Sequence, residues 1–292
     1  MWKICALFLI AVMLVGILSP WLVPHPPDQM DVLLKFQKPS WEYPLGTDHL
    51  GRCVFSRLLS AIRYSFGGAL LVLVLTVSIG IIVGSFTALK GGWFDAIFMR
   101  ICDILLAFPT LVLAFVLLGM FGSGFSNLIL ALVLSMWVYY ARIIRSMVLS
   151  LREKPFMKAA IVSGTRQWGL IFKHMVPNMM LPLLVLSTLE FGGIMLEITG
   201  FSFLGLGVQA PTAEWGMMIN DGKSYIRQHP ELMIYPGIAI MLIVIACNLL
   251  GESMRSLYEP GREVSYETKS NGSLYDKYFR RSRNRDSEDS PC

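Results

Sequence analysis

Charged residues are scarce in this sequence. Asp, Glu, Lys and Arg make up 15% of the 292 residues and 54% are hydrophobic, whereas a soluble globular domain carries roughly 25% charged residues. The mean hydropathy is +0.58. This balance excludes an ordinary soluble domain and predicts an integral membrane protein. The net charge of +5 comes from basic residues that apolar blocks separate. Because they form no continuous stripe with interleaved aromatic residues, nucleic acid is not an expected partner.

Patterns for metal binding and for ATP hydrolysis are also lacking. The five cysteines contain no CxxC pair, which argues against a disulfide framework or zinc site and favours apolar packing; they are Cys5, Cys53, Cys102, Cys247 and Cys292. The four dispersed histidines do not pair with a cysteine at chelating spacing; they are His25, His49, His174 and His229. The chain has no Gly-x4-Gly-Lys-Ser/Thr phosphate loop. We therefore expect a chain that has no resident metal or cofactor and does not itself hydrolyse ATP.

Long uncharged stretches predict the membrane spans, since a helix needs about 20 apolar residues to cross about 30 Å of hydrocarbon. The stretch 104–141 is too long for one span and contains Gly122-Ser123-Gly124, which suits a tight turn. We read it as a hairpin of two helices. The other stretches are 4–27, 66–89, 175–189 with its continuation past Glu190 and Glu197 to 207, and 232–251. The prediction is an all-α polytopic membrane protein with six transmembrane helices.

The basic residues of the connections predict the orientation. Seven of them lie between the fourth and fifth spans against the single acid Glu153: Arg142, Arg145, Arg152, Lys154, Lys158, Arg166 and Lys173. This bias places that connection, and with it both termini, in the cytoplasm. The connection 208–231 carries fewer basic than acidic residues, which suits the outside. The first connection is outside in this topology although it carries several basic residues, and we expect Arg57 and Arg63 on an interfacial helix.

The expected organisation has four parts. Residues 1–30 form the first transmembrane helix, and residues 31–65 form an extracytoplasmic loop with the interfacial helix. Residues 66–258 form a five-helix core that contains a cytoplasmic loop at 142–177. The tail 259–292 is polar and mixed in charge, which is typical of a disordered cytoplasmic segment.

The cytoplasmic loop has the signals of two short helices. Pro155 suits the first turn of a helix over 156–163, Gly164 suits a left-handed end, and Thr165 suits the cap of a second helix. A basic helical loop of this kind can simply lie on anionic lipid headgroups. On pattern alone that reading stays open beside a role in binding a protein partner.

The same loop resembles a known family. Lys158-Ala159-Ala160, then Gly164, then His174-Met175-Val176-Pro177 is similar to the E-A-A loop of permease subunits in ATP-binding-cassette importers. The two alanines, the glycine and the proline are in register with that pattern. Lys158 departs from it, because the family has Glu there. An ion pair that this Glu makes with an ATPase cannot be assumed for this chain.

Three further segments narrow the resemblance to the dipeptide, oligopeptide and nickel permeases. They are 45–52 (LGTDHLGR) with the basic residues that follow it, 202–216 (SFLGLG, then PTAEWG), and 248–255 (NLLGESMR). Together with the loop they cover about 40–260 in the right order. The connection 207–221 and the stretch 137–142 (WVYYAR) look closer to the nickel permeases than to the dipeptide permeases.

The resemblance implies the type I importer permease fold and a set of partners. These are a homologous second permease subunit, two ATP-binding-cassette ATPase subunits and an extracytoplasmic substrate-binding protein, in the cytoplasmic (inner) membrane with its lipid. The residues it assigns to ATPase coupling are Lys158, Ala159, Ala160, Gly164, His174 and Pro177. Those it places in an outer loop, near the partner permease or the binding protein, are Pro211, Glu214, Trp215 and Asp221.

Two acids predict the translocation path. Glu190 and Glu197 are seven residues apart, hence two turns apart on one helix face, and carboxylates at membrane depth often mark a pathway. Two alternatives stay open, because each acid can instead lie near an interface or be hydrogen-bonded for packing. Asn248 is a third path candidate.

The expected function is import of nickel or a nickel chelate by alternating access, driven by separate ATPase subunits. A permease for dipeptides or oligopeptides is the alternative within the family. A secondary transporter driven by an ion gradient is the alternative of another class. The sequence shows neither an inverted repeat nor paired broken helices near the midplane to support it.

Overall fold

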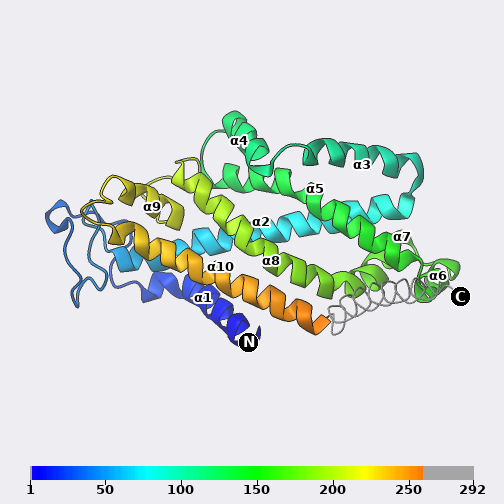
Figure 1. Ribbon diagram of the computed structural model, residues 1–292, viewed down its shortest axis with the longest axis horizontal. Coiled ribbons are helices and arrows are strands. Elements are labelled where there is room, and N and C mark those ends of the chain that lie inside the picture. The colour runs from blue at the N-terminus through cyan, green and yellow to red at the C-terminus, as the bar shows by residue number, and fades with distance from the viewer. Residues whose placement is uncertain (1, 259–292) are drawn as a thin grey trace, which may run out of the picture. The chain divides into compact units, whose positions relative to one another are not determined.

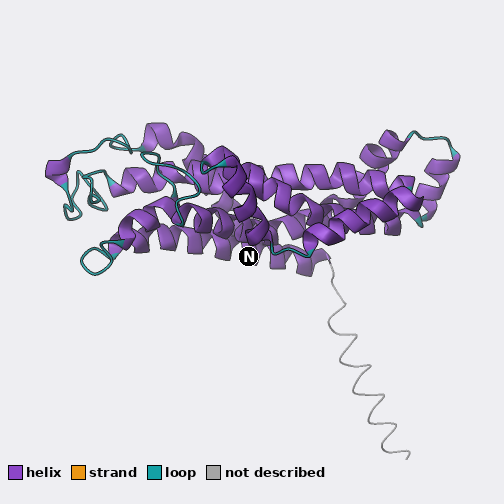
Figure 2. Ribbon diagram, turned by 90° about the horizontal axis from the view of Figure 1, so that it is seen from above, coloured by secondary structure: helices purple, strands orange, loops and turns teal. Residues whose placement is uncertain are grey.

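The computed structural model describes residues 2–258, and in this part every named element is a helix (Figure 2). An isolated β-bridge joins Thr47 and Cys53. The elements are α1 (Trp2–Leu22), a 3-10 turn (Val32–Leu34), α2 (Val54–Lys90), α3 (Gly92–Leu106), α4 (Thr110–Phe121), α5 (Phe125–Arg152), α6 (Pro155–Val162), α7 (Gln167–Gly169), a π-helix (Leu170–Met175), α8 (Val176–Phe203), α9 (Trp215–Lys223) and α10 (Glu231–Tyr258).

Residues Met1–Gly251 form one compact unit. The described part of the second unit is the end of α10, Glu252–Tyr258. Within the first unit the long helices run side by side. The α6 end carries α6 and α7, and the opposite α9 end carries α9 and the segment before α2 (Figure 1). The predicted tail 259–292 lies outside the described residues.

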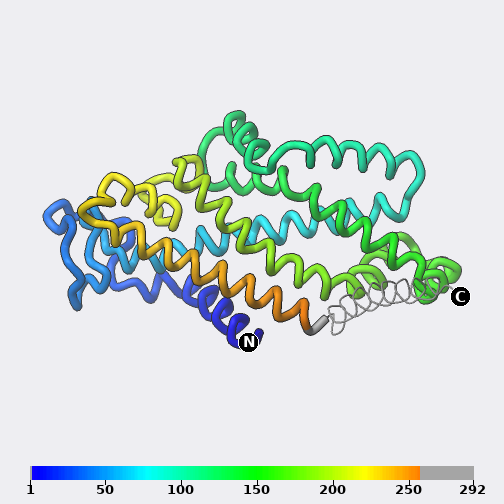
Figure 3. The backbone as a smooth tube through the Cα atoms, viewed as in Figure 1, coloured from blue at the N-terminus to red at the C-terminus, as the bar shows by residue number. Residues whose placement is uncertain are grey.

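The spans confirm an all-α membrane protein. Within residues 2–258, five helical stretches are long and apolar enough to cross a membrane: α1, α2, α5, α10, and α8 with the turns that precede it. A sixth span exists only as a bent pair, because α3 and α4 meet at 88° (Figure 3).

The break between α3 and α4 was not predicted. Pro109 precedes α4 and has no N–H to continue the ladder of α3, and it disfavours the helical conformation at Phe108. The predicted turn after α4 is present, with Gly122 and Gly124 at φ 87° and 139°.

The two arginines expected on an interfacial helix belong to a long helix instead. Arg57 and Arg63 lie in α2, which begins at Val54 rather than near residue 66. Arg57 is only 2% exposed, so it does not lie on a membrane surface. Its charge is compensated by acids of the folded chain, which removes the need for lipid headgroups or water.

The most extensive helix–helix contact of the described residues joins α2 and α5. Gly80 and Gly84 are four residues apart and face α5. A Cβ on Gly80 would lie 2.7 Å from Cβ of Tyr140, and a Cβ on Gly84 would collide with the carbonyl oxygen of Ala141. Small residues at this spacing let membrane helices approach closely enough for dispersion contacts along their length. This contact holds the centre of the unit together.

We expect Gly84→Val to destabilise the chain by about 1–3 kcal/mol, because the added atoms must push α5 away. Gly67→Ala is the matched control on the same helix, since a Cβ there meets nothing within 4 Å. Thermal unfolding of the detergent-purified chain measures both. Equal melting temperatures for the two variants would contradict this packing.

Candidate functional site

The loop at the α6 end is built as two short helical elements around a left-handed corner. Pro155 opens α6, as predicted. Gly164 has φ +78°. The N–H of Gly164 donates to the carbonyl oxygen of Ile161 at 3.0 Å and that of Thr165 to the oxygen of Ala160 at 3.2 Å. These two hydrogen bonds form a Schellman motif, which ends α6.

The predicted cap of the second helix is wrong by one residue. Arg166, not Thr165, precedes α7, and its side chain makes no cap hydrogen bond. Thr165 is used in the corner, where its N–H closes α6. The short helix then runs through the π-helix into α8, so the loop is joined to a long helix without a flexible break.

One face of this loop is buried and the other is exposed and apolar. Met157, Leu170, Ile171 and Met175 are buried, so the two elements pack on each other. Five large apolar side chains stay exposed, and we name them the loop patch: Phe156, Ile161, Val162, Trp168 and Phe172. The rings of Trp168 and Phe172 stack with centroids 6.0 Å apart. Val162 is 88% exposed at the tip.

The predicted coupling residues lie around this patch. Lys158 and Ala159 are exposed, and Ala160 is buried beneath them. Lys158 Nζ is 3.0 Å from Glu153 Oε2 on the same chain. His174 is half-buried and its carbonyl oxygen accepts from Asn178, and Pro177 is exposed in the first turn of α8.

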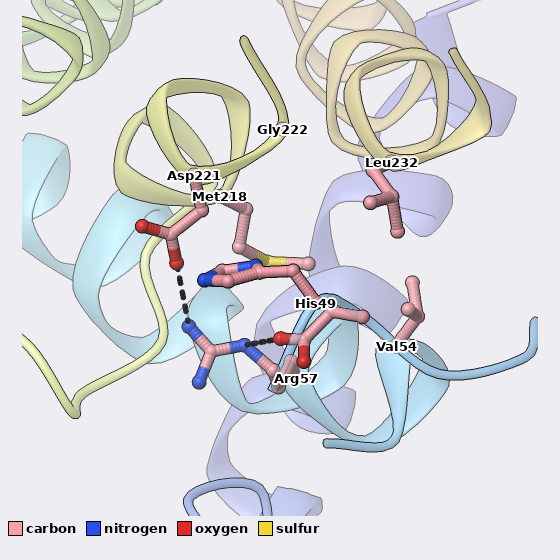
Figure 4. Close-up of a pocket in the computed structure, with 8 residues that line it drawn as sticks. His49, Val54, Arg57, Met218, Asp221, Gly222 and Leu232 are labelled. Carbon is pink, nitrogen blue, oxygen red and sulfur yellow. Dashed lines mark ion pairs between the residues drawn. The ribbon is translucent and has the colours of Figure 1, made fainter. Parts of the chain in front are cut away.

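At the α9 end, arginines and acids form a buried network. Arg52 is 1% exposed; its Nε is 2.7 Å from Asp48 Oδ2 and its Nη2 is 3.0 Å from Asp221 Oδ2. Nη2 of Arg57 lies 3.7 Å from Asp221 Oδ2 (Figure 4), and its Nε lies 3.7 Å from Asp48 Oδ2. Nη1 of Arg57 lies 3.7 Å from Asp28 Oδ1 and donates to the carbonyl oxygen of Pro211 at 3.1 Å. These charge-assisted bonds fasten the segment before α2 to α9.

Two predicted outer-loop residues are internal. Glu214 is 0% and Trp215 2% exposed, so neither presents a surface to a partner. Glu214 caps α9, accepting from the Met217 N–H at 3.0 Å and from the Ser65 hydroxyl at 2.7 Å. Burial raises the pKa of this carboxyl, and the hydrogen bonds oppose that shift. Trp215 Nε1 donates to the carbonyl oxygen of Leu58 at 3.1 Å, so both residues hold α9 on α2.

A small pocket lies beside this network (Figure 4). It leaves about 10 Å³, which is at the lower limit of the room that one water molecule needs. Nδ1 of His49 is buried there without a hydrogen-bond partner among the described residues. Burial lowers the pKa of His49 from its ordinary 6.5, an effect that Arg52 and Arg57 reinforce and Asp48 and Asp221 oppose.

Both predicted path acids lie on α8, but their hydrogen bonding differs. The hydroxyl of Tyr139 on α5 donates to Glu190 Oε1 at 3.2 Å. Oε2 of Glu197 is buried without a hydrogen-bond partner among the described residues. Asn248 is exposed on α10, and no hydrogen bond in the described part joins it to either acid. In residues 2–258 no three His, Cys, Asp or Glu side chains gather as they would around a metal ion.

Sequence reasoning missed Tyr139 and the partner of Arg142. It counted Arg142 among the basic residues of the cytoplasmic connection; the residue lies within α5, 2.9 Å from Asp103 of α3. The signal was present in the sequence as polar residues recurring on one helix face at 135, 139, 142 and 146.

Comparison with known proteins places the chain among transport components. A family model described as binding-protein-dependent transport system inner membrane component matches residues 76–264. The nickel transport system permease protein NikC of Escherichia coli (strain K12) is 42% identical over 256 residues, which cover 87% of this chain and 92% of that protein.

Two other relatives carry different substrates in their names. The metal-staphylopine import system permease protein CntC of Staphylococcus aureus (strain NCTC 8325 / PS 47) is 38% identical over 84% of this chain and 85% of its own length. The dipeptide transport system permease protein DppC of Alkalihalophilus pseudofirmus is 34% identical over 85% of this chain and 81% of its own length.

The pocket around His49 predicts a pH-dependent stability. The folded pKa lies below the unfolded value of 6.5. The unfolded chain therefore binds more protons just below pH 6.5, and the stability present above this pH is lost as the pH falls. We expect the melting temperature of the purified chain to drop between pH 7.5 and 5.5. His49→Gln should flatten this drop, whereas His174→Gln at the opposite end should keep it. An unchanged slope in His49→Gln would refute the assignment.

Proposed function

The chain belongs to the family of binding-protein-dependent transport system inner membrane components, and we propose that it moves nickel or a nickel chelate across the cytoplasmic membrane. It is a multi-pass permease of the nickel and peptide importers, with the type I importer permease fold. In the proposed function it works by alternating access, driven by two separate ATPase subunits.

The loop at the α6 end is the observation that carries this proposal. A rigid knob needs a fixed corner and a continuous connection to the spans. Gly164 supplies the corner, and the π-helix supplies the connection to α8. The loop patch is apolar and solvent-facing on the chain alone, which suits a contact with another protein. Movement of an ATPase would then be transmitted as rigid-body motion of the helices.

Lys158 changes the charge of this proposed contact. Where the family has Glu, this chain has a lysine that is paired with its own Glu153 at 3.0 Å. Both side chains are exposed, so water screens the pair and it adds little to stability. Lys158 therefore supplies no carboxylate to an ATPase, and the proposed contact relies on shape and apolar burial.

The remaining partners follow from the same assignment. The proposed complex contains a homologous second permease and an extracytoplasmic binding protein, which delivers the substrate to the α9 end. Both termini are then cytoplasmic. The chain has no phosphate loop, so ATP hydrolysis belongs to partner chains and this subunit is proposed to be non-catalytic.

Two observations favour nickel over peptides. The nickel permease of Escherichia coli shares 42% identity with this chain, and the dipeptide permease of Alkalihalophilus pseudofirmus shares 34%. Glu190 and Glu197 also place two carboxylates on one face of α8, which suits a cationic cargo. Peptide import remains the alternative, since a peptide's amino terminus is also a cation.

Gly164→Val should uncouple the subunit while leaving it inserted. A β-branched side chain at φ +78° is strained, so the corner must change shape. We expect at least about ten-fold less ATP-driven uptake together with reduced ATPase co-purification, which is the loss of about 1.4 kcal/mol of coupling. Gly119→Ala is the control, since a Cβ there meets nothing within 4 Å. Normal uptake and co-purification in Gly164→Val would refute the role of the corner.

Uptake of radiolabelled nickel tests the substrate directly. Cells with and without this chain are compared at submicromolar nickel, with excess unlabelled dipeptide as competitor. We expect uptake to disappear without the chain and to resist the dipeptide. Unchanged nickel uptake in the deletion would move the substrate to peptides. Uptake that persists without the ATPase subunits would instead indicate an ion-gradient transporter.

A further inference from the structure

An ion pair lies on the surface of the long helices. Arg142 Nη2 of α5 is 2.9 Å from Asp103 Oδ1 of α3, and the two side chains are 55% and 41% exposed. α5 has 28 residues, about 42 Å of helix for about 30 Å of hydrocarbon. Arg142 stands 17 residues after Phe125, about 26 Å along α5, so a hydrocarbon layer of about 30 Å that begins at Phe125 includes it.

The same face of α5 is polar over three turns. Ser135, Tyr139, Arg142 and Ser146 recur at helical spacing, and we name them the α5 stripe. Exposure rises along the stripe: Ser135 is buried, Tyr139 is half-buried, and Arg142 and Ser146 are exposed. The stripe thus opens toward the α6 end.

α8 presents a matching open face. Glu190, Gly193, Glu197 and Gly200 lie on one side of this helix, and we name them the α8 face. Gly193 and Gly200 are exposed, and a Cβ on either would meet nothing within 4 Å. The Tyr139–Glu190 hydrogen bond of 3.2 Å joins the α5 stripe to the α8 face.

Lipid is a poor neighbour for such surfaces. A charged side chain at membrane depth costs several kcal/mol against hydrocarbon, and such residues almost always face a bundle interior or a water-filled cavity. Arg145, also on α5, is an arginine that the chain itself covers. Its Nε donates to Asp95 Oδ1 at 2.6 Å, and its side chain is only 27% exposed. The Arg142–Asp103 pair is more open than this and needs water beside it.

We propose that the α5 stripe and the α8 face line one translocation path, and that Arg142 with Asp103 is its charge-selective step. This inference rests on the proposed function. The path carries carboxylates at Glu197, Glu190 and Asp103, and one guanidinium at Arg142. It therefore fits a cargo that carries a carboxylate beside a cationic centre. Arg142 receives the carboxylate while Asp103 receives the cationic part, so each keeps an opposite charge during passage.

Cysteine labelling tests whether the two faces meet water. In the assembled transporter, with all five native cysteines replaced by serine, Ser146→Cys and Gly193→Cys are treated with charged methanethiosulfonate reagents in permeabilised membranes. Leu130→Cys and Leu184→Cys are the controls, since these leucines are 44% and 47% exposed on the opposite faces of α5 and α8. We expect labelling at the first two positions at least about ten-fold faster than at the controls. Equal rates would overturn the path.

The charge-selective step has its own readout. Arg142→Gln should lower the ratio of anionic to cationic reagent rates at Ser146→Cys by at least about three-fold, and Asp103→Asn should raise it, because each change alters the local potential. A merely structural role would change both rates together. Arg227→Gln, an exposed arginine at the α9 end, is the control and should leave the ratio unchanged. An unchanged ratio in Arg142→Gln would overturn the proposal.

Transport assays distinguish a failure of the proposed function from a failure of the charge-selective step. If wild-type membranes show no ATP-dependent uptake of radiolabelled nickel or dipeptide, the proposed function falls with the role of the path in it. If uptake is normal but Arg142→Gln transports at the wild-type rate, only the charge-selective step falls. We expect at least about five-fold slower uptake in Arg142→Gln, with normal assembly judged by co-purification of the ATPase subunits.

Discussion

A charge or an unpaired polar group in hydrocarbon is costly, and this constraint orders most of the structure. It selects helices, which satisfy their own backbone, for the membrane-crossing elements of the described part of the chain. It also explains why Arg52 and Arg57, almost fully buried at the start of α2, are surrounded by Asp48 and Asp221. Charges that are only partly covered, such as the Arg142–Asp103 pair, then stand out as places where water or substrate completes the environment.

The packing of the long helices connects the two ends of the molecule. α5 passes directly from its contact with Gly80 and Gly84 of α2 into α6, and the π-helix passes directly into α8. The loop patch is therefore attached to the two helices that carry the α5 stripe and the α8 face. In the proposed function, a displacement of the loop is transmitted along these two helices to the Tyr139–Glu190 contact. Packed helix interfaces switch between discrete arrangements and do not deform continuously.

Local sequence signals predicted local structure well. The corner at Gly164 and the turn at Gly122-Ser123-Gly124 were predicted because only glycine adopts these conformations without strain. Hydropathy predicted the long helices, but not the bend at Pro109, since a proline can either kink a helix or cap the next one. Local patterns could not predict contacts between distant parts of the sequence. Arg52, for example, donates a hydrogen bond to Asp221, which is 169 positions away in the sequence. Without such partners, Arg57 suggested a membrane surface, and Glu214 and Trp215 suggested an exposed loop.

The most direct test of the central claim, that the loop at the α6 end couples this permease to separate ATPases, is photocrosslinking from the loop patch. A photoreactive residue replaces Val162, which is 88% exposed at the tip, and Ile226, 52% exposed at the α9 end, is the control position. The account predicts a crosslink from position 162 to an ATP-binding-cassette ATPase subunit in native membranes, and none from position 226. Crosslinks from position 162 to lipid alone would contradict it and leave the loop as a membrane-surface element.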